Sequence, residues 1–427
     1  MAVNRLDWKY ASAIGSFVAA TALAAAAGAA PRPARPHGSA TRPAKPLSKK
    51  LKPYPTRYYV IYTDLAGDEV REAAARLTAM AEEYHRRTRD FAGVIRNRLP
   101  FGLFSSREDY YAAGGMKNTG GMYHPERQLL MAVADGGADA GLWHVVQHEG
   151  FHQFADLVIG GGLPTWVDEG LAEYFGQGIW TGDGFVTGLA PPRRTGRVKG
   201  YIRDGTLVPF TKMLMMTQEQ WNQAVEADEA EADADAEPPD RTPEKATLHY
   251  DQAWSMVHFL VHGEEAKYRR AFARFIKDVS RGENWTEAFR SRFGRNIKAF
   301  EYRYRRWWLA REESPTWPLY VKAVVQTLTS FLGRAVSQGQ KFATAEQFFR
   351  AARSRELAGD KAQWLPPMLL EEMLLHARKW KGWSLDSRGG SPKLVLGPMR
   401  GKTFTGTFTH SRGKVDNVKV EITDPKP

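Results

Sequence analysis

The feature that most constrains this chain is the segment His148-Glu-Gly-Phe-His152, which has the pattern HExxH. On a helix, His148 and His152 project from one face, about 6 Å apart along the axis. Two neutral imidazoles in this arrangement can bind one zinc ion, and Glu149 stands beside them, about 100° further round the helix. The segment therefore predicts a helix with one face turned toward a metal.

A catalytic zinc site also needs a third protein ligand and an open position for water. The segment after a glycine-rich turn offers two acids, Glu169 and Glu173, one helical turn apart. We expect a short helix over residues 166–175, with Thr165 as its capping residue and Asp168 three positions later. Both carboxylates would then lie on the same face of this second helix.

The two segments together resemble the gluzincin metallopeptidases, whose aminopeptidase-like clan combines HExxH with Trp-(Leu/Val)-x-Glu-Gly. Here the second motif reads Trp166-Val-Asp-Glu-Gly170. More closely still, the sequence looks like the peptidase-MA-like DUF1570 group of exported bacterial proteins. This resemblance implies that His148, His152 and Glu169 are the zinc ligands and that Glu149 is the general base and proton shuttle.

One spacing departs from the aminopeptidase pattern. Sixteen residues separate His152 from Glu169, instead of the usual eighteen, so the connection must be tighter. Glu173 therefore remains an alternative third ligand; if Glu169 binds, Glu173 is placed to orient a ligand histidine. His144, one turn before His148, is expected to support the site by packing or a hydrogen bond.

A third segment, Leu248 to Leu260, resembles the aminopeptidase segment whose tyrosine hydroxyl stabilises the oxyanion. Tyr250 matches that tyrosine, although Ala253 replaces the usual glycine. The neighbouring His249 can donate the same hydrogen bond. The alternative is that Tyr250 is an ordinary core residue near the start of an amphipathic helix.

Before the HExxH segment, the chain alternates between strand and helix patterns. Apolar periodicity predicts a strand over residues 58–63, a helix over 68–89, strands over 99–104 and 127–133, and the HExxH helix over 140–156. By the resemblance, residues 120–131 form the sheet edge that pairs with extended substrate; the alternative is an ordinary loop and an internal strand.

The expected fold class is α+β, in two folded parts. A metallopeptidase-like domain spans residues 53–315, with a mixed sheet, the HExxH helix, a helical subdomain and an acidic loop at 226–240. The C-terminal region, 316–427, has helical patterns followed by short strands: helices at 319–335, 343–357 and 367–380, and strands at 393–396, 403–409 and 415–422.

The N-terminus indicates export. In residues 1–30, Arg5 and Lys9 precede an Ala-rich apolar stretch, as in a signal peptide cleaved after about Ala29 or retained as a membrane anchor. Residues 31–52 are rich in proline and basic residues and are expected to be a disordered tether. These features predict a periplasmic or extracellular protein.

Composition narrows the chemistry. The absence of cysteine excludes a lipoprotein, disulfides and thiolate ligands, which leaves histidine and carboxylate as zinc donors. Of the net charge of +12, the signal carries +1, the tether +7 and the acidic loop −8, so the remainder carries +12. This basic remainder favours an anionic substrate or an anionic cell-envelope surface, and no nucleic-acid-binding module accompanies it.

These features predict an exported zinc peptidase that acts on a peptide or protein substrate. Glu149 would take a proton from the zinc-bound water, and Tyr250 would stabilise the oxyanion. The alternative is a non-catalytic, zinc-containing binding protein of the cell envelope that keeps a peptidase fold. The intact Glu149 favours the enzyme, because a purely structural zinc site has no need of a base.

Overall fold

The computed structural model describes residues 50–117, 119–135, 140–224, 245–388 and 390–424. The expected export signal, most of the tether and the acidic loop lie outside these ranges. The described chain is a mixed α+β protein, as expected. It divides into two compact units: the first holds the described residues up to Val70, Tyr84–Gly178 and Ala190–Pro315, and the second holds Arg71–Glu83, Ile179–Leu189 and the described residues from Thr316.

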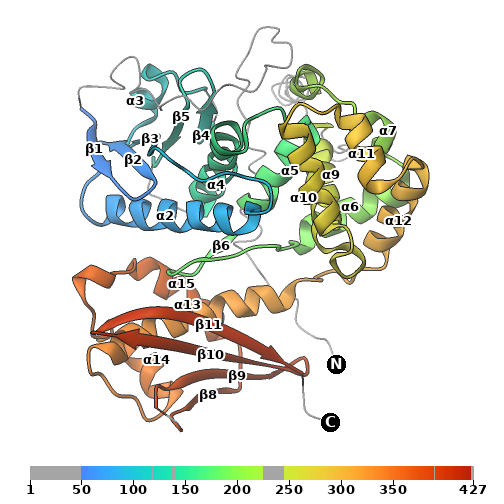
Figure 1. Ribbon diagram of the computed structural model, residues 1–427. Helices are drawn as coiled ribbons and strands as arrows, with labels where there is room; N and C mark the ends of the chain where they lie inside the picture. Colours follow the sequence, from blue (N-terminus) through green and yellow to red (C-terminus); the bar gives the residue numbers. More distant parts are fainter. Residues whose placement is uncertain (1–49, 118, 136–139, 225–244, 389, 425–427) are drawn as a thin grey trace, which may run out of the picture. The chain divides into compact units, whose positions relative to one another are not determined.

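The first unit contains a five-stranded mixed sheet in the order β1-β2-β3-β5-β4 (Figure 1). The central strands β2, β3 and β5 are parallel, and β1 and β4 pair antiparallel at the two edges. The strands are β1 Lys52–Pro55, β2 Tyr59–Thr63, β3 Leu99–Phe104, β4 Gly121–His124 and β5 Leu129–Val133.

Parallel neighbours need a crossover, which helix α2 (Asp68–Thr88) provides between β2 and β3. The expected strands at 58–63 and 99–104 and the helix at 68–89 are therefore confirmed to within a residue or two. Strand β1 was not expected, because its two prolines resemble the tether. At a sheet edge proline is tolerated, since its missing N–H leaves no ladder partner unsatisfied.

The region expected to form the sheet edge is a hairpin of β4 and β5. Only β4 is the edge strand, whereas β5 lies between β3 and β4. The predicted strand at 127–133 begins later, at Leu129, because residue Gln128 turns with a positive φ of 52°. The short helix α3 (Arg107–Ala112) connects β3 to this hairpin and packs on β3 and β5.

Two helices in sequence carry the HExxH segment and the acids that follow it. Helix α4 (Ala140–Phe154) packs on β4 and β5, and also on α5 (Thr165–Gly176). Between them, residues Ala155–Ile159 form a π-helical turn, so α4 ends two residues earlier than expected. The expected cap at Thr165 is wrong: Thr165 is the first helical residue, and Pro164 precedes it without a side-chain cap.

The remaining helices of this unit include α6 (Pro192–Asp204) and α7 (Phe210–Met213), which the sequence patterns missed. Helix α6 begins with a proline, follows another at Pro191 and contains two glycines, a composition that suggested turns. Proline is in fact favoured at the first helical position, and Gly205 closes the helix in the left-handed region. Further helices of this unit are α9 Lys245–Ala266, α10 Arg269–Ser280, α11 Trp285–Phe293 and α12 Ile297–Leu309.

Helices α5 and α9 approach each other closely at Gly170. A Cβ atom there would lie 2.6 Å from the carbonyl oxygen of Ala253, a contact that backbone cannot relieve cheaply. We therefore expect Gly170→Ala to lower the free energy of unfolding by about 1–3 kcal/mol, measured by urea denaturation. In the control Gly196→Ala on α6, the new Cβ meets nothing within 4 Å, so stability should stay equal or rise. Equal stability of the two variants would contradict this account.

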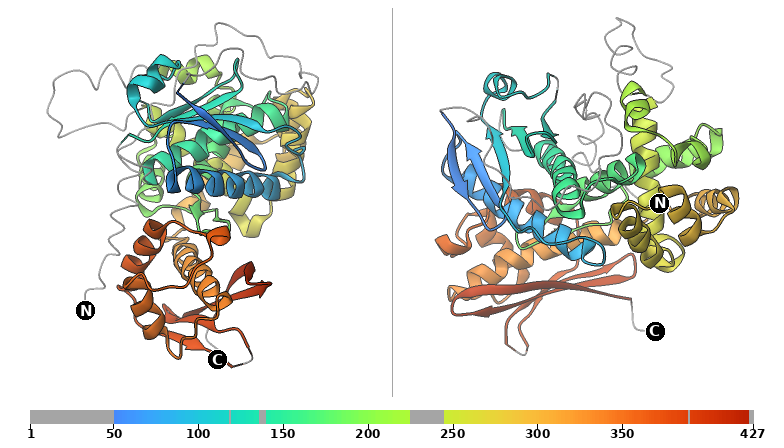
Figure 2. Two further views of the ribbon diagram at one scale, coloured as in Figure 1. Left: turned by 90° about the vertical axis from the view of Figure 1, so that its left-hand side faces the viewer. Right: turned by 45° about the horizontal axis from the view of Figure 1, so that its top comes forward.

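The second unit is built on a four-stranded antiparallel sheet in the order β11-β10-β9-β8, with α13 packed against three of its strands (Figure 2). All the expected C-terminal helices and strands are present with shifted ends, and β8 is additional. The elements are α13 Trp317–Ser337, α14 Ala345–Arg353, α15 Pro367–Ala377, β8 Trp383–Asp386, β9 Lys393–Met399, β10 Lys402–Ser411 and β11 Lys414–Thr423. A short hairpin of β6 (Ile179–Trp180) and β7 (Phe185–Val186) also belongs to this unit.

None of the helices within the described ranges is both long and apolar enough to cross a bilayer.

Candidate metal centre

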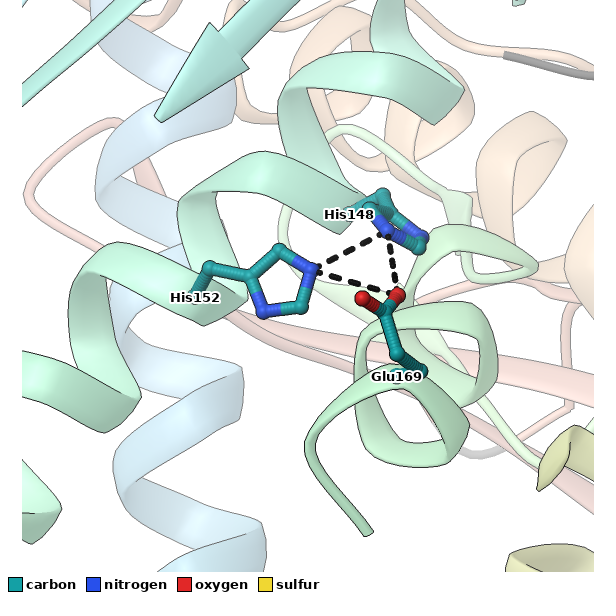
Figure 3. A group of neighbouring side chains, drawn as sticks. All are labelled: His148, His152 and Glu169. Carbon is teal, nitrogen blue, oxygen red and sulfur yellow. Dashed lines mark hydrogen bonds and ion pairs between the residues drawn. The ribbon is translucent and has the colours of Figure 1, made fainter. Parts of the chain in front are cut away.

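Three side chains converge between α4 and α5 in the first unit (Figure 3). The Nε2 atoms of His148 and His152 are 3.1 Å apart, and Glu169 Oε2 lies 3.5 Å from the first and 3.6 Å from the second. Donor atoms that bind one tetrahedral ion at about 2.0–2.1 Å are about 3.4 Å from one another. The three residues expected as ligands therefore form a triangle of the size that a zinc ion requires.

The chemistry of this triangle also fits a cation. Among the described residues, no group gives Glu169 Oε2 a hydrogen bond of normal geometry, although the side chain is only 7 % exposed. A buried carboxylate oxygen without a hydrogen-bond donor is costly, and a bound cation would compensate for it. Two imidazole nitrogens and one carboxylate oxygen are the donor set of many catalytic zinc sites.

Each of the two imidazole rings has a carboxylate close to its Nδ1 atom, on the side of the ring away from Glu169. His148 Nδ1 lies 3.4 Å from Glu173 Oε1, and His152 Nδ1 lies 3.1 Å from Asp168 Oδ2. These contacts leave both Nε2 atoms directed toward Glu169. Glu173 thus takes the orienting position on the far side of a ring, and Asp168, expected only as a helix-start residue, takes the equivalent position for His152.

The acids around the imidazoles favour positive charge at this centre. Burial alone would lower the pKa of His148, but Glu169 and Glu173 outweigh it and raise that pKa to about 9. For His152, Asp168 and Glu169 likewise overcome burial and raise the pKa well above its usual value. Burial would raise the pKa of Glu169, yet the two imidazoles lower it to about 2. A divalent ion would supply the same positive charge.

Glu149 lies on α4 beside the triangle and is anchored by the sheet edge. Its Oε2 accepts a hydrogen bond of 2.9 Å from the backbone N–H of Tyr123 on β4. Burial raises the pKa of Glu149, against the opposing effect of His148 and His152. A carboxylate with a raised pKa, next to a metal centre and fixed in orientation, is suited to accept and return a proton.

Tyr250, from α9, lies close to the same centre. Its buried ring lies 6.2 Å from that of His148, centroid to centroid, and packs edge-on against Trp221 at 5.0 Å. Burial, reinforced by Glu169, raises the pKa of Tyr250 well above 10, so its hydroxyl stays protonated. The ring of His249 also lies near Trp221, 5.5 Å from it between ring centroids and tilted by 38°.

His144 supports the end of α5 and lies outside the triangle. Its Nδ1 is 2.9 Å from the carbonyl oxygen of Gly176. Burial lowers the pKa of His144, which keeps the ring neutral. This agrees with the expectation that His144 packs and forms a hydrogen bond near the site.

Sequence reasoning missed a set of buried charges behind Glu173. Arg194, on α6, bonds to Glu173 Oε2, and its Nε lies 2.7 Å from Asp251 Oδ1. Asp251, on α9, also receives two hydrogen bonds from Arg197, of 2.5 and 2.9 Å. No signal in the sequence pointed to this set, because charge partners from separate helices leave no local pattern.

Comparison with known proteins adds no assignment to this geometry. No family model, no curated protein and no solved structure matches the chain.

Proposed function

We propose that this chain is an exported zinc-dependent peptidase with a gluzincin-like catalytic domain. The observation that carries the proposal is the triangle of His148, His152 and Glu169, with the Glu149 carboxylate beside it. A structural zinc site is normally closed by four protein ligands, whereas a catalytic one has three and leaves a position for water. Export is inferred from the basic-then-apolar pattern of residues 1–30.

Each residue of the site has a role in peptide hydrolysis. Zinc held by the three ligands would acidify water and polarise the scissile carbonyl. Glu149 takes a proton from the attacking water and delivers it to the leaving amine. The Tyr250 hydroxyl donates a hydrogen bond to the carbonyl oxygen as negative charge develops on it.

The strand next to Glu149 supports a peptide as the substrate. β4 ends the sheet, and its residue Tyr123 touches the proposed base through backbone N–H. An extended peptide that pairs with this edge would bring its backbone carbonyls alongside Glu149 and the metal ligands. A small ester or amide would gain nothing from such an edge.

Tyr250→Phe separates the proposed oxyanion role from simple packing. We expect kcat on a peptide substrate to fall by about 10²–10³-fold with little change in KM, because the hydrogen bond forms only as charge develops. Zinc content and thermal stability should stay close to wild type, since the ring is retained. An unchanged kcat would assign Tyr250 to the core alone.

The proposal as a whole is tested on the purified, signal-free protein by metal analysis and a peptide library. We expect one zinc per chain, cleavage of peptides, loss of cleavage with a chelator and recovery on adding zinc. A protein that holds zinc and cleaves no peptide would favour the non-catalytic binding protein. A protein that binds no divalent metal would refute both.

A further inference from the structure

We propose that Arg194 is a positioning residue for the metal centre, acting through Glu173 on His148. This inference rests on the proposed zinc site and assigns a part of it that lies on another helix. The contacts run in one line through four helices: His148 on α4, Glu173 on α5, Arg194 on α6 and Asp251 on α9.

The two carboxylate oxygens of Glu173 have different partners. Oε2 is taken by Arg194 Nη1, and Oε1 faces His148 Nδ1 at 3.4 Å. A glutamate has three rotatable bonds, so without Arg194 the carboxylate can rotate away from the ring. With one oxygen held, the other stays where it orients the imidazole, whose Nε2 then points at the metal position.

Arg194 is itself fixed by three contacts and is nearly inaccessible to solvent. Besides Glu173, its guanidinium contacts Asp251 and lies 4.9 Å from the ring centre of Trp254. Its side chain is 8 % exposed. A buried cation between two acids and an aromatic ring is costly to assemble, which argues for a task that an apolar residue in this place could not perform.

The alternative is that Arg194 only ties α6 to α9. Arg197 makes the matched control, because it sits on the same helix and pairs with the same Asp251 through two hydrogen bonds. Among the described contacts, Arg197 has none with Glu173. Arg194 and Arg197 therefore share Asp251, and in the described part of the chain only Arg194 of the two also contacts Glu173 and the Trp254 ring.

The test compares zinc affinity, measured by competition with a chromogenic chelator, in Arg194→Met and Arg197→Met. We expect Arg194→Met to bind zinc about 10–100-fold more weakly, which is the usual effect of losing the group that orients a ligand. Arg197→Met should lower thermal stability but leave zinc affinity within about threefold of wild type. The visible spectrum of the cobalt-substituted protein should change only in Arg194→Met.

Two further variants keep the test decisive. Arg194→Lys retains the charge but cannot bridge both acids, so its zinc affinity should lie between those of Arg194→Met and wild type; it carries the comparison if the Met variant does not fold. In a Glu173→Gln background, Arg194→Met should add little further loss, because both changes break the same line of contacts.

Two outcomes would overturn the inference in distinguishable ways. Wild-type zinc affinity in Arg194→Met, or equal losses in the Arg194 and Arg197 variants, would leave Arg194 as a structural tie while the zinc site stands. Absence of zinc binding by the wild-type protein would remove the proposed function and the inference together.

Discussion

Glu149→Gln is expected to abolish nearly all hydrolysis while leaving the metal in place. The amide has the same shape and can still accept the hydrogen bond from Tyr123, but it cannot take a proton from water. The loss of a general base typically costs about 10²–10⁴-fold, and kcat on a peptide substrate should fall within that range. Zinc content by metal analysis should remain at the wild-type level, because Glu149 lies outside the triangle of donor atoms.

A matched control uses an acid far from this chemistry. Glu69 is exposed in the first turn of α2, so Glu69→Gln should change neither rate nor metal content. If Glu149→Gln keeps more than a tenth of wild-type activity, the proton must be taken by another group. The proposed mechanism would then be wrong even though zinc is bound.

The second large effect is expected on metal binding and separates Glu169 from Glu173. Glu169→Ala removes a donor atom of the triangle and should weaken zinc binding by more than about 100-fold, with loss of hydrolysis. Glu173→Ala removes only the group behind His148 and should weaken binding by about 10–100-fold. Both affinities can be measured by chelator competition on the folded, metal-free proteins.

The order of these two effects is the decisive result. If Glu173→Ala loses zinc more completely than Glu169→Ala, the acid one turn later is the ligand and the roles are reversed. Circular dichroism of the metal-free variants checks that the comparison is made between folded proteins. Equal affinity in both variants and wild type would show that zinc binds elsewhere.

The local part of the site was foreseeable from the chain alone. Residues four apart on a helix share a face whatever the rest of the fold does, so the pairing of His148 with His152 follows from the spacing. The same argument puts Glu169 and Glu173 on one face of α5. Most of the longer strands and helices followed equally from apolar periodicity. The elements that did not follow include β1 and α6, whose prolines and glycines resemble loops, and short elements such as α3, α7 and β8.

Tertiary packing decided how these local pieces are used. The spacing left Glu169 and Glu173 as rival ligands, and only the docking of α5 against α4 directs one to Nε2 of the histidines and the other to the back of His148. Arg194 and Asp251 join the site from helices that lie 21 and 78 residues beyond Glu173 in sequence. Helical periodicity determines which side chains share a face, but only the packing of separate helices decides which faces meet, because those contacts depend on residues distant in the chain.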